Sequence, residues 1–429
     1  MKQFQLRYEK EFAFSAWLQK VHRYCDDHHT PAGSILFRIY SDSIDSSLMK
    51  PVLVRLRDEF PDALYAGVTS IGNIIHGSLA DSHVSITCTI FEDPDTQVRI
   101  LQYPMTFETQ KATAEALLSE VRANPWVRAV EILSTLRNVD MIDFFHELSD
   151  LPEEICVYGG GAYATDIPNG DTSDVFVLSS EGAIAKNNAV FILMGGPNLH
   201  IDTTSLTGWQ RLGKSFTDFH AEGKLLKEIN GYPAAEVYRH LLDIPEDHRF
   251  FRLANVFPLS FKEDETDYLR AVVSPLPDGS LQLSTAVNGA DTLSISYGDP
   301  VHIFDCLQDI LKRIQDFSPQ VIQLFSCAAR KFFWGNSSVS RETLPFESLA
   351  STSGFYTSGE FLRNGKKIFM HNITLVIVSM REGAPETFKK PFLTDREVIS
   401  HQKLVGNCLV SYINALSNEE DPYRLHSDA

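Results

Sequence analysis

Glycine clusters mark the places where this sequence could hold a ligand against its main chain. Most of them follow an apolar run that predicts a strand, and a glycine there leaves the backbone open because it has no Cβ. Tight turns produce the same pattern, and Gly195-Gly196-Pro197 is interpreted as a turn only. The candidate segments are Gly67-Val68-Thr69-Ser70-Ile71-Gly72, Gly159-Gly160-Gly161 and Gly354-Phe355-Tyr356-Thr357-Ser358-Gly359-Glu360.

The glycines at 159–161 do not predict a dinucleotide-binding loop. Such a loop opens a helix whose amides point at pyrophosphate, whereas Pro168, Asn169 and Gly170 follow here and disfavour a helix. The sequence also lacks a Gly-x-Ser-x-Gly elbow, a P-loop and a His-Glu-x-x-His helix. The local signatures of hydrolases, nucleotide hydrolases and zinc proteases are therefore missing.

Cys327 and His371 are the side chains with the most reactive chemistry near these segments. Cys327 ends an apolar run and lies three residues before Arg330, a basic setting that favours a thiolate, although a small core residue is an equal alternative. His371 precedes a predicted strand, where an imidazole could ligate haem iron, titrate or serve only as a structural hydrogen-bonding group. The adjacent His28-His29 lies in a polar loop and predicts no metal site.

The elements that position these residues alternate between helix and strand. Apolar spacing predicts helices at 11–24, 51–60, 106–123, 141–148, 234–242 and, after the cap Asp299, from Pro300 onward. Period-two patterns and buried runs predict strands between them, an antiparallel meander over 172–229, and a final helix, Asp395–Leu416. The fold class we expect is α/β (mixed α+β), with two related halves of mixed or antiparallel sheets covered by helices in a layered, sandwich-like arrangement. The predicted domains are 1–222, 223–390 and a C-terminal helix and polar tail, 391–429.

The charge balance excludes several classes of partner. The 429 residues carry 38 Lys and Arg against 56 Asp and Glu, a formal net charge of −18, so the attraction to phosphate that supports nucleic-acid binding is missing. No apolar run approaches the roughly 20 residues of a membrane helix, and the first residues do not resemble a signal peptide. We therefore expect a cytoplasmic protein without membrane insertion, whose six scattered cysteines are reduced thiols.

An ordered set of these motifs resembles the FIST family, whose two parts are called FIST N and FIST C. The resemblance spans roughly residues 30–385. Gly67–Ile74 resembles the family's Gly-Cys-Ser-Thr-x-Gly-Glu segment, and Tyr158–Asp166 resembles its Gly-Gly-x-Ala-x-Asp segment. Phe325–Arg330 is similar to its Cys-x-x-Arg segment, and Gly354–Glu360 followed by His371–Thr374 is similar to its most recognisable signature. Val68 replaces the usual Cys, Asn73 replaces the usual Glu, and Ser358 stands where an aromatic or small residue is common.

The resemblance implies a sensory module that binds a small ligand, with amino acids suggested for the family, and not an enzyme. In bacteria such modules work with a signalling output protein such as a histidine kinase or a diguanylate cyclase, in two-component or cyclic-di-GMP signalling. Some members that resemble this chain bind haem and sense nitric oxide, so haem with His371 as axial ligand is an alternative. An enzyme using Cys327 as nucleophile or Glu360 with Asp166 as acid and base is a second alternative, and an interaction scaffold is a third.

Our leading hypothesis places the ligand between the two halves. Arg330 would pair with a ligand carboxylate, Glu360 would hold an ammonium group, and neighbouring polar side chains would orient the ligand. The predicted ligand-binding residues are Thr69, Ser70, Tyr158, Gly159, Gly160, Asp166, Cys327, Arg330, Tyr356, Glu360, His371 and Asn372.

Overall fold

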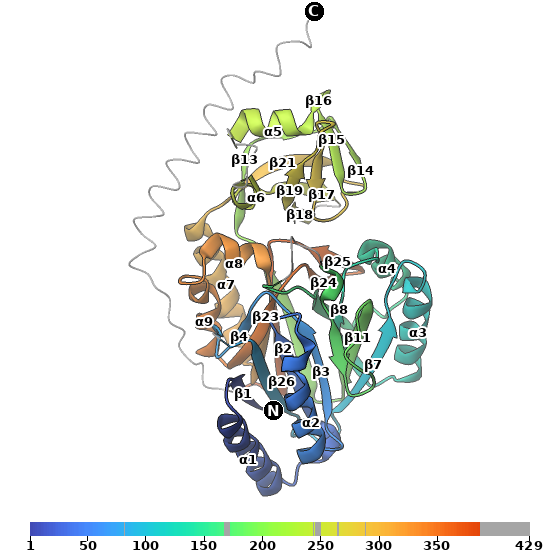
Figure 1. Cartoon of the computed structure of the whole chain (residues 1–429), viewed down its shortest axis with the longest axis vertical. Helices are drawn as coiled ribbons and strands as arrows, with labels where there is room; N and C mark the ends of the chain where they lie inside the picture. Colours follow the sequence, from blue (N-terminus) through green and yellow to red (C-terminus); the bar gives the residue numbers. More distant parts are fainter. Residues whose placement is uncertain are drawn as a thin grey trace, which may run out of the picture.

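The computed structural model describes residues 1–80, 82–166, 172–242, 244, 250–263, 266–287 and 289–386. Its fold is mixed α+β, which confirms the predicted class: mixed and antiparallel sheets are covered by helices (Figure 1). The predicted helix Asp395–Leu416 lies outside the described residues. The predicted domain boundaries stay a prediction. In the described part of the chain, no helix has the length and apolar character needed to cross a bilayer.

The first 90 residues form a sheet with helices on one face. The strand order is β1-β6-β2-β3, in which β2 and β3 are parallel and the other neighbours are antiparallel. Phe14, Trp17 and Val21 of the first helix are buried against the sheet, as the amphipathic pattern predicts. The elements are β1 (Lys2–Tyr8), α1 (Glu11–His28), η1 (Ala32–Ser34), β2 (Ile35–Ser41), η2 (Ser46–Leu48), α2 (Lys50–Glu59), β3 (Leu64–Thr69) and β6 (Val84–Ile90).

The same arrangement occurs twice more, so the body consists of three matching units. Unit 2 has the order β7-β11-β8-β9 and unit 3 the order β12-β26-β22-β23, and in each the last two strands are the parallel pair. Unit 2 comprises β7 (Gln97–Pro104), α3 (Gln110–Ala123), β8 (Val127–Ser134), α4 (Met141–Glu147), β9 (Cys156–Gly161) and β11 (Asn188–Gly195), and unit 3 comprises β12 (Leu199–Leu206), α7 (Pro300–Phe317), β22 (Val321–Cys327), α8 (Ala328–Trp334), α9 (Ser340–Glu347), β23 (Ser351–Thr357) and β26 (Leu375–Glu382).

Each unit exports a short segment that completes the sheet of another unit. The segment of unit 1 extends the β23 edge of unit 3, that of unit 2 extends the β3 edge of unit 1, and that of unit 3 extends the β9 edge of unit 2. The exchange closes a cycle and joins the units into one body. The exported segments are β4 (Asn73–Ile75) with β5 (Ser78–Leu79) from unit 1, η4 (Thr172–Asp174) and β10 (Val177–Ser179) from unit 2, and β24 (Glu360–Asn364) with β25 (Lys367–His371) from unit 3.

A separate small domain is inserted in unit 3 between β12 and α7. It has two sheets, β13-β21-β17-β18 and β14-β15-β20-β19, with its own apolar core, and Figure 1 shows it above one end of the body. Its elements are β13 (Trp209–Phe216), β14 (Phe219–Glu222), β15 (Leu225–Ile229), β16 (Tyr232–Pro233), α5 (Ala234–Leu242), α6 (Phe250–Ala254), β17 (Leu259–Glu263), β18 (Thr266–Arg270), β19 (Val272–Pro275), β20 (Leu281–Leu283) and β21 (Thr292–Gly298).

The three inner sheet faces share one core, and a polar triad lies in it at matching positions. Arg38, Glu131 and Gln323 are all buried, and each directly precedes the residue that pairs with a glycine of the parallel neighbour strand. The guanidinium of Arg38 lies 2.7 Å from Glu131, and the Gln323 amide donates to the same carboxylate over 2.8 Å. A buried charge needs such partners, so the three units are held in one relative register by this network.

Several sequence-based expectations need correction. The strands predicted over 172–229 do not form a meander, because β10, β11 and β12 join three different sheets. The helix predicted from Thr106 begins at Gln110. Residues 106–109 form a turn instead, in which Thr106 N donates to Thr109 Oγ1 and the two threonine hydroxyls are hydrogen-bonded to each other. The predicted cap Asp299 is confirmed and accepts from Val301 N over 2.9 Å. The segment after Cys327 contains two helices, α8 and α9, that are not among the helices predicted from apolar spacing.

Candidate functional site

The glycine clusters found in the sequence lie on the third strand of each unit. Gly67, Gly159 and Gly354 face the same position of the parallel neighbour strand. A Cβ on them would lie 2.2, 1.9 and 1.9 Å from the carbonyl oxygens of Ile39, Ile132 and Leu324. No other residue fits at this distance, so these glycines are needed for close strand packing. Gly160 is packed as well, because its Cβ would lie 2.6 Å from Thr357 Cγ2.

The turns after these strands, here called the corners (residues 69–73, 161–165 and 356–360), meet one another. Ile71 N donates to Tyr356 O over 3.0 Å, Tyr163 N to Thr69 O over 3.0 Å, and Gly161 N to Gly359 O over 2.9 Å. The structure therefore brings the three glycine-bearing segments together. It joins them by main-chain hydrogen bonds, however, so they form a packed ring rather than the lining of a cleft.

Corners 1 and 3 share one hydrogen-bonding motif. In corner 1, Ser70 Oγ donates to Asn73 Oδ1 over 2.6 Å and accepts from Gly72 N over 3.3 Å. In corner 3, Thr357 Oγ1 donates to Glu360 Oε1 and accepts from Gly359 N, both over 2.9 Å. The motif stabilises the turn that sends the exported segment to its partner sheet. Ser70 thus has a structural role.

Four more predicted residues also serve the framework. Thr69 Oγ1 donates to Phe176 O over 3.3 Å, and Asp166 accepts from Ser43 Oγ over 2.6 Å and from Ile44 N over 2.9 Å. Tyr158 lies fully buried in the shared inner core. Tyr356 is fully buried too, in the outer core of unit 3. None of these side chains is presented to solvent except that of Asp166.

Glu360 and Cys327 form a buried pair below corner 3. Glu360 accepts from Thr357 Oγ1 and, over 3.2 Å, from Thr374 N, and it also receives the Cys327 thiol. Burial raises the pKa of Glu360 to about 8, because it disfavours the charged carboxylate more than these donors stabilise it. Burial and the neighbouring Glu360 raise the pKa of the Cys327 thiol well above its usual value. The thiolate expected from the sequence is therefore disfavoured.

Arg330 does not offer its guanidinium to a ligand. It is fully buried, forms an ion pair with Glu342 (Nε to Oε2, 2.9 Å), and donates from Nη1 to the carbonyls of Thr207 and Ile373 over 2.8 Å each. Its guanidinium also lies 4.9 Å from the ring centroid of Trp209. The expected pairing with a ligand carboxylate would have to break this network, so Arg330 is a structural residue that anchors the base of the inserted domain.

His371 and Asn372 lie where the body meets the inserted domain. Asn372 Oδ1 accepts from Ser284 Oγ over 2.7 Å and from Thr285 Oγ1 over 3.2 Å, both of the inserted domain. The His371 ring lies 5.9 Å from that of Phe369, and its buried Nε2 has no partner among the described residues. Burial, and to a lesser extent nearby Arg270, lower the pKa of His371 to about 4, so it is neutral at physiological pH.

Ile373, the next residue, has a strained main chain. Its φ of +59° lies in the left-handed region, which costs an L-residue about 1–2 kcal/mol and is unusual for a β-branched side chain. The side chain is fully buried and its carbonyl accepts from Arg330, so the surrounding contacts maintain the strain.

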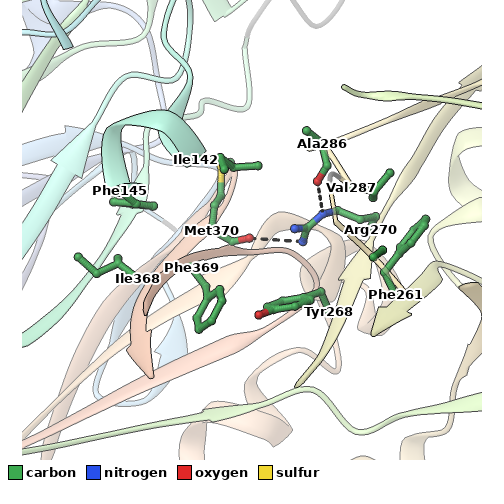
Figure 2. A pocket seen from close by; sticks show the side chains of 11 residues that line it. Ile142, Phe145, Phe261, Tyr268, Arg270, Ala286, Val287, Ile368, Phe369 and Met370 are labelled. Carbon is green, nitrogen blue, oxygen red and sulfur yellow. Dashed lines mark hydrogen bonds between the residues drawn. The ribbon is translucent and has the colours of Figure 1, made fainter. Parts of the chain in front are cut away.

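A cavity of about 130 Å³ lies between the inserted domain and the body, close to this segment. Figure 2 shows it between α4 and β25 on one side and the inserted domain on the other, with the Arg270 guanidinium directed at the carbonyls of Ala286 and Met370. Arg270 is the one charged residue among the described residues that line it. The lining residues are Ile142, Phe145, Phe261, Tyr268, Arg270, Ala286, Val287, Ala290, Ile368, Phe369 and Met370.

None of the sequence-predicted site residues lines this cavity. Its walls come from three distant stretches, α4, residues 261–290 and β25, that show no common spacing in the sequence. The one sequence feature that could have indicated this cavity is that two of its lining residues, Phe369 and Met370, directly precede the predicted site residue His371. The glycine motifs pointed instead to the corners, whose chemistry is structural.

Comparison with known families agrees with the resemblance. The FIST N domain matches residues 37–232, and the FIST C domain matches residues 234–363. The two matches meet inside the inserted domain. A comparison with curated proteins found no match. The matches cover most of the chain, and the chain therefore belongs to the FIST family, whose domains are sensory domains associated with signalling.

Proposed function

We propose that the chain senses a small molecule bound in the cavity between the inserted domain and the body, and passes its occupancy to a signalling partner. The observation that carries the proposal is the cavity itself, which has walls from both parts and is mainly apolar. Ligand sites in proteins are typically apolar hollows with a few polar groups, often at domain junctions. A ligand there contacts both parts at once, so its binding favours one relative arrangement.

The size and lining of the cavity indicate the ligand class. An apolar cavity of about 150 Å³ is enough to bind benzene, so 130 Å³ suits a ligand of similar size. Phe145, Phe261 and Phe369 offer aromatic contacts, and Arg270 offers a cation at one wall. The ligand we propose is a small compound with an aromatic or branched apolar group and a carboxylate, which includes amino-acid-like metabolites. In this proposal the ligand carboxylate meets Arg270 rather than Arg330, and it competes with the carbonyls of Leu269, Ala286 and Met370 to which Arg270 donates in this structure.

The output belongs to the same proposal. The family association with signalling and the attachment of the inserted domain through two chain crossings, after β12 and before α7, support a module that changes the position of one part when the cavity fills. A cytoplasmic bacterial histidine kinase or diguanylate cyclase is the partner we propose. A pull-down of the purified chain with each enzyme, followed by its activity with and without the cavity ligand, tests this step.

Titration calorimetry with benzoate, phenylacetate, leucine and phenylalanine tests the cavity. We expect at least one to bind, and Arg270→Gln to weaken that binding by about tenfold, since a charge-assisted hydrogen bond contributes about 1.5–3 kcal/mol. Arg211→Gln is the matched control, because Arg211 pairs with Asp267 on the exposed face of the same domain. If none of the four compounds binds, or both variants behave alike, the proposed ligand class is wrong.

The haem alternative does not fit the described cavity. The buried Nε2 of His371 has no partner in the described part of the chain, as an axial ligand would need, but the neighbouring cavity is of benzene size, and a porphyrin is several times larger. The haem alternative stays a prediction that an absorption spectrum of protein from a haem-replete host tests.

The enzyme alternative has the difficulty that its residues are not accessible. Cys327 and Glu360 are in contact, but they are only 5% and 0% exposed, so a substrate has no access to them in this arrangement.

A further inference from the structure

The segment His371–Thr374, which joins β25 to β26, contacts both the inserted domain and the buried groups of unit 3. Asn372 is bonded to Ser284 and Thr285, as described above. Two residues later, Thr374 N donates to Glu360 over 3.2 Å, and Thr374 O accepts from Cys327 N over 3.0 Å. The segment also follows directly on Phe369 and Met370, which line the cavity.

The main-chain strain at the centre of this segment is maintained by contacts on both sides of it. Ile373 is held with φ +59° between the Asn372 contacts on one side and the Arg330 and Glu360 contacts on the other. Extended backbone is intrinsically preferred for a β-branched residue, so weakening either set of contacts favours release of the strained state. A residue held in this way responds to both neighbours at once.

We infer that residues 371–374 transmit occupancy of the cavity to the buried Cys327, Arg330 and Glu360 side chains. This inference rests on the proposed function, because it assigns the route by which the cavity reports. A molecule in the cavity contacts Met370 on the body and residues of the inserted domain, so it holds the two parts together. It thereby strengthens the bonds of Ser284 and Thr285 to Asn372, stabilises the strained segment and closes the cover over Cys327.

Thiol labelling tests the route without a known ligand. The substitution Ala286→Leu fills part of the cavity wall and serves as a surrogate for occupancy. The labelling rate of Cys327 by iodoacetamide is measured by peptide mass spectrometry relative to that of Cys88, which is fully buried in unit 1 and reports general opening. We expect Ala286→Leu to slow Cys327 relative to Cys88 by about fivefold, the lower end of typical coupling between sites. Ala221→Leu on β14 is the control and should leave the ratio unchanged.

Removing the hydrogen bonds between Asn372 and the inserted domain should abolish the slowing of Cys327 labelling. In the background of Asn372→Ala, or of the double variant Ser284→Ala/Thr285→Val if the first does not fold, Ala286→Leu should no longer slow Cys327. An unchanged ratio in Ala286→Leu alone, or a slowing that survives removal of the link, would overturn the inference. A titration with benzoate separates the two proposals: failure of benzoate and its analogues to bind rejects the proposed ligand class, whereas the surrogate still decides the route.

Discussion

Corner 1 and corner 3 have the same turn, but the side chain at its last position donates hydrogen bonds to the surroundings in corner 1 and accepts them in corner 3. In corner 1, the Asn73 amide donates toward the carbonyls of Tyr40, Ser82 and His83 at 3.3, 3.5 and 3.4 Å. In corner 3, the side chain at the matching position is Glu360, and its neighbours are donors. Asn73, which replaces the family's glutamate in corner 1, is therefore matched to the carbonyl oxygens around it. It does not indicate a changed ligand.

The largest effect is expected from reversing the donor at corner 1. Asn73→Asp keeps the shape but places carboxylate oxygens against three carbonyl oxygens in a buried site, which we expect to destabilise the fold by about 3 kcal/mol. Urea unfolding at neutral pH measures it. Asn364→Asp, at the exposed last residue of β24, is the control and should change stability by less than about 0.5 kcal/mol. Equal effects of the two would remove the explanation of corner 1 by its acceptors.

An intermediate effect is expected at corner 3, and it depends on pH. The folded pKa of Glu360 is about 8 and its ordinary value is 4.5, so between these values the unfolded chain loses a proton that the folded chain keeps. The contribution of Glu360 to stability is therefore full below pH 4.5 and is lost as pH rises toward 8. Glu360→Gln should flatten the dependence of unfolding free energy on pH over that window. A pH slope identical to that of the wild type would contradict a protonated Glu360.

His371 acts in the opposite direction and has to be separated from Glu360. Its folded pKa of about 4 lies below its ordinary 6.5, so the unfolded chain takes up a proton first and stability falls as pH drops from 6.5 toward 4. His371→Gln should remove this fall. The double variant with Glu360→Gln should leave the region from pH 4.5 to 8 nearly flat in urea unfolding, apart from the exposed groups. A fall that persists below pH 6.5 in His371→Gln would assign it to another group.

The smallest effect is expected when Thr357 of corner 3 is replaced by serine, the residue type at the matching position of corner 1, Ser70. Thr357→Ser keeps the bond to Glu360 and the bond from Gly359 but removes the methyl group that packs on Gly160, so a loss of about 1 kcal/mol is expected. Thr357→Val keeps the size and removes the hydroxyl, and it should cost more because Glu360 loses a buried donor. The reverse order of the two in urea unfolding would mean that packing outweighs hydrogen bonding at this corner.

Individual helices and strands could be predicted where the apolar spacing was clear, but the pairing of the strands into sheets could not. The helix after Asp299 has a cap, a proline at its start and a buried stripe, and it was found. The partners of β10, β11 and β12 could not be read from period-two patterns, because such patterns give a strand's faces but not its neighbours. The glycine motifs located the three corners correctly and suggested a ligand role. Their packing role depends on distances to Ile39, Ile132 and Leu324, which no spacing in the sequence reveals.

The exchange of exported segments also governs how the chain can be assembled. The β4 strand of unit 1 pairs with β5 beside it and with β23, at Ser353–Phe355, which comes nearly the whole length of the body later in the chain. Contacts of such long sequence separation slow folding, because the entropy of closing the loop opposes them before any bond forms. The sheet of unit 1 can be completed once β10 has been synthesised, whereas the sheet of unit 2 needs β24 from late in the chain. A fragment cut at the junction of the FIST N and FIST C matches would therefore leave open sheet edges. Such edges promote aggregation, so we expect the two family parts to fold together rather than separately.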